Sequence, residues 1–135
     1  MPYSLDFFHG TKIASLFAAM NEILLCTHNP ILLKNVYGIL RDEGFTVEVV
    51  DQPALAVQRV FQGNYTAVII DSESFGLSAE DAVQIIKSVS PDVVVICVGF
   101  AKLNSDVMSV NLPVDLEEFK QAIHDVRRFS ALSRI

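Results

Sequence analysis

The sequence predicts one α/β domain of three layers, in which helices cover both faces of a doubly wound, five-stranded parallel β-sheet. Two observations support this fold class. Short apolar runs alternate along the chain with stretches whose apolar residues recur at helical spacing. The runs are apolar at nearly every position, as parallel strands are when helices bury both of their faces. A chain of 135 residues, 51% of them apolar, fits one domain with a substantial core.

The first strand and helix are marked by a change from continuous to periodic apolar residues. Ile23–Cys26 is a continuous apolar run of strand length. Asn29 then suits the N-cap position, and Pro30 suits the first helical turn, where a missing N–H costs nothing. The periodic stretch that follows ends at Gly44, a typical stop signal for a helix.

A second strand–helix unit and a third strand follow directly. Residues 45–50 alternate at first between apolar and polar side chains, as an edge strand does. Pro53 opens the next predicted helix, which ends at Gly63. Residues 65–70 then form the third predicted strand. This strand leads directly into Asp71, so a carboxylate is expected where a buried strand ends.

The third helix and the fourth strand have equally clear signals. Ser78 and Asp81 form a capping-box pattern at the start of a helix that continues to about Val89. Residues 93–98 are the most apolar run of the chain, which favours a place inside the sheet.

The last unit has a short connection and a well-capped helix. Only about eight residues separate Gly99 from the fifth strand at 107–110, whereas a helical crossover needs at least ~10–12. We therefore expect the fourth helix to be shortened or replaced by a loop. Asp115 and Glu118 form a second capping-box pattern before the final helix.

The predicted domain covers residues 22–129, between an extension at 1–21 and a tail or linker start at 130–135. The extension is expected to hold an amphipathic helix, because its apolar residues fall at i, i+3, i+4 and i+7: Ile13, Leu16, Phe17 and Met20. We favour packing of this helix on its own domain. The alternative is that it pairs with a partner or with a second copy of the chain.

Composition excludes several functional classes. The formal charge is −6 with a pI near 4.9, and no cluster of Lys and Arg is present, so neither nucleic acid nor an anionic membrane is an expected partner. The apolar run at 13–20 is too short to span a bilayer and lacks the features of a signal peptide. Cys26 and Cys97 lie within apolar runs without metal-binding spacing, which indicates reduced, buried thiols in a cytoplasmic protein.

Four segments, taken in order, resemble the receiver domain of bacterial two-component response regulators (CheY-like domains): ILLCTHNP, TAVIIDSESFGLSAEDAVQIIK, PDVVVICVGF and NLPVDLEEFKQAI. They resemble, respectively, the first strand with its acidic turn, the phosphoacceptor strand with its loop and helix, the fourth strand, and the exit from the fifth strand. The resemblance covers about residues 22–129. It implies a flavodoxin-like sheet of strand order 2-1-3-4-5, with Asp71 at the carboxyl edge.

The resemblance also implies a chemistry, aspartyl phosphorylation assisted by Mg²⁺, but this sequence departs from the family's pattern. Asp71 falls at the phosphoacceptor position. Thr27 and His28 fall at the positions of the acidic pair, and neither is a carboxylate. Gly99 falls at the Thr/Ser switch position and Leu112 at the lysine position, so neither contributes the hydroxyl or the ammonium group that holds a phosphate.

These departures predict that Mg²⁺ binding is weak or absent, and no other metal or cofactor is expected. We interpret Asp71 as a solvated carboxylate that caps a loop amide or bonds His28, which we expect to be its only candidate partner nearby. The alternative interpretation is that Asp71 is a working phosphoacceptor.

The predicted function is that of an atypical receiver domain, a pseudo-receiver that acts by protein–protein contact in bacterial signal transduction and not as an enzyme. Its expected partner is a signalling protein, such as a histidine kinase or an output domain, and a homodimer is a further option. The main alternative is a response-regulator receiver that is phosphorylated on Asp71. A weaker alternative is a flavodoxin-like domain that binds a small ligand or catalyses a reaction at the same edge of the sheet.

Overall fold

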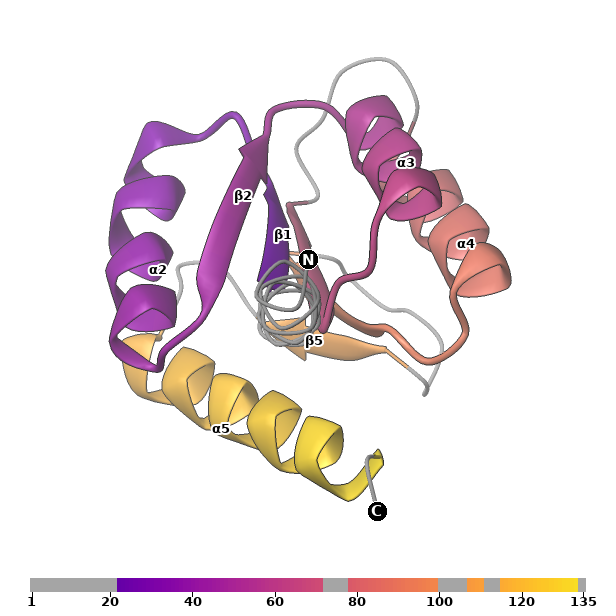
Figure 1. The fold of residues 1–135 in the computed structure, drawn as a ribbon. Coiled ribbons are helices and arrows are strands. Elements are labelled where there is room, and N and C mark those ends of the chain that lie inside the picture. The colour runs from indigo at the N-terminus through magenta and orange to yellow at the C-terminus, as the bar shows by residue number, and fades with distance from the viewer. Residues whose placement is uncertain (1–21, 72–77, 100–106, 111–114, 134–135) are drawn as a thin grey trace, which may run out of the picture.

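The computed structural model describes residues 22–71, 78–99, 107–110 and 115–133. They form one five-stranded parallel sheet of order β2-β1-β3-β4-β5 (Figure 1), which confirms the predicted fold class and strand order. The elements, labelled as in Figure 1, are β1 (Glu22–Cys26), α2 (Pro30–Asp42), β2 (Thr46–Val50), α3 (Pro53–Gln62), β3 (Ala67–Asp71), α4 (Ala79–Val89), β4 (Val94–Val98), β5 (Met108–Val110) and α5 (Leu116–Ser133).

Helices cover both faces of the sheet, with α2 and α5 on one face and α3 and α4 on the other (Figure 1). The strands therefore divide the interior into two apolar cores. In β1, Leu24 and Cys26 belong to the core under α3 and α4, whereas Ile23 and Leu25 belong to the core under α2 and α5. Alternation of this kind is what a pleated strand produces when each of its faces is buried.

The helices begin where the sequence predicts, α3 at Pro53 and the other three after a capping side chain. The Asn29 side chain accepts hydrogen bonds from the N–H groups of Ile31 and Leu32, at 2.9 and 3.2 Å, and Pro30 occupies the first turn. Ser78 Oγ accepts from the Asp81 N–H at 3.1 Å at the start of α4. At the start of α5, Asp115 Oδ1 accepts from the N–H groups of the next turn. Each cap satisfies N–H groups that lack a partner within the helix.

Helix α2 ends at Asp42, and two residues later Gly44 adopts a left-handed conformation, with φ of 89°. The Phe45 N–H donates to the Leu40 carbonyl at 3.0 Å, and the Gly44 N–H donates to the Arg41 carbonyl at 3.0 Å. This is the Schellman arrangement, in which glycine reverses the chain without steric cost. It directs the chain into β2.

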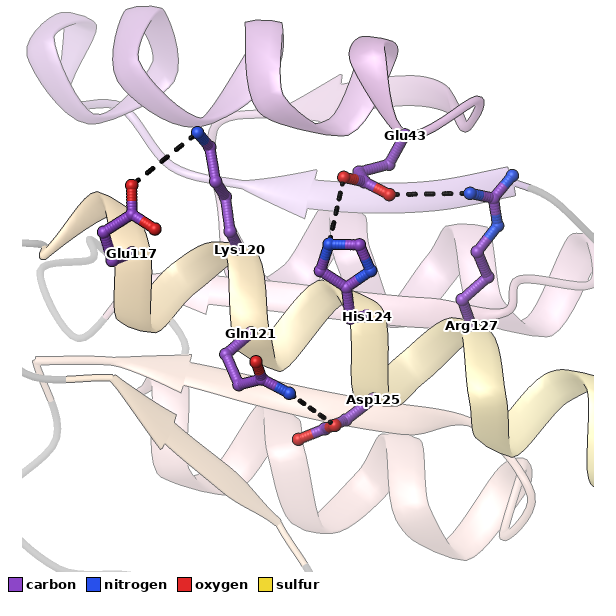
Figure 2. A network of polar contacts seen from close by, with 7 residues as sticks. All are labelled: Glu43, Glu117, Lys120, Gln121, His124, Asp125 and Arg127. Atoms are coloured by element: carbon purple, nitrogen blue, oxygen red, sulfur yellow. Dashed lines mark hydrogen bonds and ion pairs between the residues drawn. The ribbon is translucent and has the colours of Figure 1, made fainter.

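Side chains at the end of α2 and along α5 connect these two helices at the amino edge of the sheet (Figure 2). The carboxylate of Glu43 lies 3.3 Å from His124 Nε2 and 3.5 Å from Arg127 Nη1. The Arg127 guanidinium also lies over the Phe45 ring, 5.9 Å from its centroid. We call Glu43, His124 and Arg127 the Glu43 cluster.

The strand boundaries differ from the sequence-based predictions at their ends. The predicted third strand, 65–70, begins at Ala67 and includes Asp71, which pairs in register with Val98 of β4. Strand β2 lies at the edge of the sheet, as its alternation predicts, and most of its residues are partly or fully exposed. The burial of Asp71 within β3 changes the interpretation of the candidate site.

Several sequence-based predictions fall outside the described residues. They concern the amphipathic helix in the 1–21 extension, the shortened connection within 100–106, Leu112, and part of the tail at 130–135. The domain boundaries therefore remain predictions. No helix within the described part of the chain is long and apolar enough to cross a membrane.

Candidate functional site

The candidate site lies at the carboxyl edge of the sheet, where Asp71 ends the central strand β3. Its side chain is only 3% exposed. The prediction of a solvated carboxylate is therefore wrong. The physical reason is that Asp71 is the last residue of β3, paired in register with Val98 of β4, and does not belong to the loop that follows.

The hydroxyl group of Thr27, which follows the neighbouring strand β1, donates a hydrogen bond to one oxygen of this buried carboxylate. Thr27 Oγ1 donates a hydrogen bond to Asp71 Oδ2 at 2.9 Å, and Thr27 itself is only 4% exposed. The Thr27 N–H donates to the Val50 carbonyl at 3.0 Å, and the Asn29 N–H donates to Thr27 Oγ1 at 3.0 Å. These contacts fix the hydroxyl group, which accepts from Asn29 while it donates to Asp71.

The prediction that His28 is the only nearby candidate partner of Asp71 is wrong, since Thr27 contacts the carboxylate directly. The contact follows from the register between β1 and β3. Leu25 pairs with Ile69, so Thr27 and Asp71, each two residues further on, point to the same side of the sheet. His28 is exposed and follows Thr27 by one residue.

The thiol of Cys26, the last residue of β1, stays protonated near neutral pH. Burial raises the pKa of Cys26 to about 12, and the carboxylates of Asp71 and Asp51 add to this shift. Burial likewise raises the pKa of Cys97 to about 12. Because the thiolate is the reactive form of cysteine, neither residue is suited to nucleophilic chemistry. Both are free and buried, as the sequence predicts.

The backbone conformation at the switch position explains why this position holds a glycine, Gly99. Its φ is 80°, a conformation that residues with a Cβ rarely adopt. Its N–H donates to the Val110 carbonyl at 2.8 Å, which connects the end of β4 to β5. A serine or threonine would be strained in this turn, so its backbone favours glycine over the usual hydroxyl residue. Leu112, at the lysine position, lies outside the described residues.

The described donor groups at this edge do not fit Mg²⁺. This ion prefers hard, anionic oxygen ligands in octahedral geometry. Asp71 contributes one carboxylate, of which one oxygen already accepts from Thr27. Thr27 and His28 stand where the resemblance expects acidic residues. Within the part of the chain that the structure describes, no three His, Cys, Asp or Glu side chains are grouped so that they could hold a metal ion.

Of the comparisons with known proteins, the one with solved structures supports the fold. No family model matches the sequence, and no curated protein matches it. Among solved structures, a CheY-like response regulator receiver domain protein from Methanospirillum hungatei JF-1 superposes with a TM-score of 0.73 at 16% identity. The match covers 82% of this chain and 97% of that one.

Two further structures show the same likeness. The receiver domain of a sensor histidine kinase from Pseudomonas aeruginosa PAO1, with a magnesium ion in its active site cleft, has a TM-score of 0.68 at 21% identity; the match covers 82% of this chain and 98% of that one. A chain in the complex of the histidine kinase ThkA with the response regulator TrrA has a TM-score of 0.69 at 20% identity. The match covers 78% of this chain and 97% of that one. This chain therefore has the fold of response regulator receiver domains.

Proposed function

We propose that this chain is an atypical receiver domain that acts in signal transduction through protein–protein contact, without the usual Mg²⁺-dependent phosphorylation cycle. Three sets of observations support the proposal: the receiver fold, the hydrogen bond between Thr27 and Asp71, and the left-handed turn at Gly99. The hydrogen bond carries the proposal, because it involves the one carboxylate that phosphorylation requires.

In a working receiver the aspartate attacks a phosphoryl group, and the negative charge on the transferring oxygens has to be neutralised. Here the position beside Asp71 supplies a hydroxyl group that donates to the carboxylate. A donated hydrogen bond withdraws electron density from the attacking oxygen and adds no anionic ligand for a cation. Burial of Asp71 also restricts the approach of a phosphodonor. These features favour a structural role for Asp71.

The expected partner is a signalling protein, such as a histidine kinase or an output domain. One structure of the same fold contains a response regulator bound to a histidine kinase, which supports this kind of partner. A homodimer is a second way in which such a domain can act. Neither interaction requires the domain to be an enzyme.

One observation favours a second candidate function, that of a phosphoacceptor receiver. Asp71 occupies the carboxyl end of the central strand, which is where ligands bind in open α/β sheets. If Thr27 rotates away when a phosphodonor arrives, the carboxylate becomes available. The two functions differ in one measurable outcome, the covalent modification of Asp71.

The test exposes the protein to acetyl phosphate, and separately to beryllium fluoride, in the presence of Mg²⁺. We expect no mass addition and no change in amide chemical shifts around Asp71. The matched control is Asp71→Asn, which keeps the shape of the side chain but cannot be phosphorylated. An addition that the wild type acquires and this variant does not would establish the phosphoacceptor function and overturn our proposal.

A titration with Mg²⁺ alone separates metal binding from phosphorylation. We expect no saturable change in the amide shifts of Thr27, His28 or Asp71 up to millimolar concentrations, because no three described His, Cys, Asp or Glu side chains are grouped so that they could hold a metal ion. A saturable change that Asp71→Asn abolishes would mean that the edge holds the ion after all.

A further inference from the structure

Three of the four large exposed apolar side chains on helices α3 and α4 lie in the second half of their helix. Phe61, in the last turn of α3, is 65% exposed. Val89, the last residue of α4, is 38% exposed, and Ile85, one turn earlier, is 37% exposed. Helices α3 and α4 pack against each other (Figure 1). We call these three residues the α3–α4 patch.

The patch lies toward the amino edge of the sheet, opposite the candidate site. Both helices run antiparallel to the strands, so their last turns are near the strand starts (Figure 1). The Thr66 N–H donates to the Glu22 carbonyl at 2.8 Å, and the Val94 N–H donates to the Thr66 carbonyl at 3.2 Å. Phe61 precedes Thr66, and Val89 precedes Val94, by five residues each, so the last turns of α3 and α4 lie near the starts of β3 and β4.

The sequence predicts an apolar stripe in the chain just before Glu22, the residue that begins β1 at this same edge. The sequence predicts an amphipathic helix at 13–20, and Asn21 alone separates it from β1. Eight helical residues are only ~12 Å long. A five-residue strand spans roughly 17 Å, so the opposite edge of the sheet lies beyond the reach of this helix. We therefore expect the apolar stripe of such a helix to contact residues near the start of β1.

Among the described residues, the other large apolar side chains that are strongly exposed lie toward the carboxyl edge: Ile31, Val49, Leu55 and Leu116. The α3–α4 patch is thus the exposed apolar surface within reach of the extension in this part of the chain. We propose that residues 13–20 form a helix that packs its stripe onto the α3–α4 patch of the same chain. Burial of apolar surface on both sides stabilises this contact.

A pair of introduced cysteines tests the contact without altering either apolar surface. Ala19→Cys lies beside the stripe and Gln62→Cys lies beside Phe61, whereas Lys34→Cys on α2 serves as the distant control for the second position. The two native thiols are buried and have pKa values of about 12, so a bis-maleimide at neutral pH reacts with the introduced ones.

We expect the Ala19→Cys/Gln62→Cys chain to give mostly intramolecular cross-links, several-fold more than Ala19→Cys/Lys34→Cys. Equal yields from both pairs, or no product, would overturn the proposal. Cross-linked dimers as the main product would also overturn it and assign the patch to a second copy of the chain.

A substitution within the patch provides an independent test. In the Ala19→Cys/Gln62→Cys background, Phe61→Ser should lower the cross-link yield several-fold because it removes the most exposed apolar side chain of the patch. Ile31→Ser removes an even more exposed side chain at the opposite edge and should leave the yield unchanged. If both substitutions act alike, or neither has an effect, the contact does not involve the patch.

Discussion

The two edges of the sheet hold carboxylates in contrasting surroundings. At the carboxyl edge, Asp71 is buried and accepts a hydrogen bond from the buried hydroxyl of Thr27. At the amino edge, Glu43 lies beside His124 and Arg127, whose side chains are about half exposed (Figure 2). The printed contact of Asp71 is therefore with a buried, uncharged hydroxyl group, whereas Glu43 lies beside an imidazole and a guanidinium group that water also reaches.

This difference shows that the number of polar contacts in a cluster does not measure its contribution to stability. A buried polar group that loses its partner pays the full cost of desolvation, whereas an exposed ion pair exchanges its partner for water at little cost. The hydrogen bond at the carboxyl edge should thus matter more for stability than the more extended Glu43 cluster. Three substitutions test this ranking.

The largest effect is expected from Thr27→Val, which replaces the hydroxyl with a methyl group of similar size. The Asp71 carboxylate then loses a buried donor, and the Asn29 N–H loses its acceptor. We expect a loss of about 1–3 kcal/mol in the free energy of unfolding, measured by urea denaturation. Thr27→Ser keeps the hydroxyl and should lose clearly less. Equal losses in the two variants would show that packing of the methyl group, and not the hydrogen bond, is what matters.

An intermediate effect is expected from Gly44→Ala, next to the Glu43 cluster. Gly44 has a φ of 89°, and an added Cβ would lie 3.1 Å from Arg127 Nη2. We expect the free energy of unfolding to fall by about 1 kcal/mol. Gly38→Ala, in the interior of α2 with open space around it, is the control. It should raise stability by up to about 1 kcal/mol, so thermal melts of the two variants should shift in opposite directions.

The smallest effect is expected from Glu43→Gln, which removes the charge shared by His124 and Arg127. Ion pairs whose cationic partner is about half exposed, as Arg127 is, contribute about 0.2–1 kcal/mol, and salt screens them. The stability difference from wild type should therefore shrink between low salt and molar salt. Glu117→Gln, which removes a longer and more exposed contact with Lys120, should be nearly neutral. A loss for Glu43→Gln larger than that for Thr27→Val would invert the ranking of the two edges.

Most of the fold could be predicted because its signals are local. The caps at Asn29, Ser78 and Asp115 each depend on hydrogen bonds within one helical turn, and the structure places all three as predicted. The strands inside the sheet are continuous apolar runs because both of their faces are buried. Strand order followed from the resemblance and is confirmed.

The candidate site was predicted less well because it depends on contacts between segments far apart in the sequence. The position of Asp71 at the carboxyl edge is correct, but its burial and its contact with Thr27 depend on the register between β1 and β3. Thr27 and Asp71 are 44 residues apart, and no local pattern reports such a register. The unusual backbone of Gly99 likewise appears only when the turn after β4 is seen.

The alternation of strand residues between two separate cores limits how this domain can change over evolutionary time. Ile69 and Asp71 share one face of β3, whereas Val68 and Ile70 share the other. An insertion or deletion of one residue within β3 would exchange these faces and turn the carboxylate toward α3 and α4. Changes of two residues would preserve the faces. The strands of such a domain should therefore vary in length by even numbers, while single-residue changes accumulate in the connections between strands and helices.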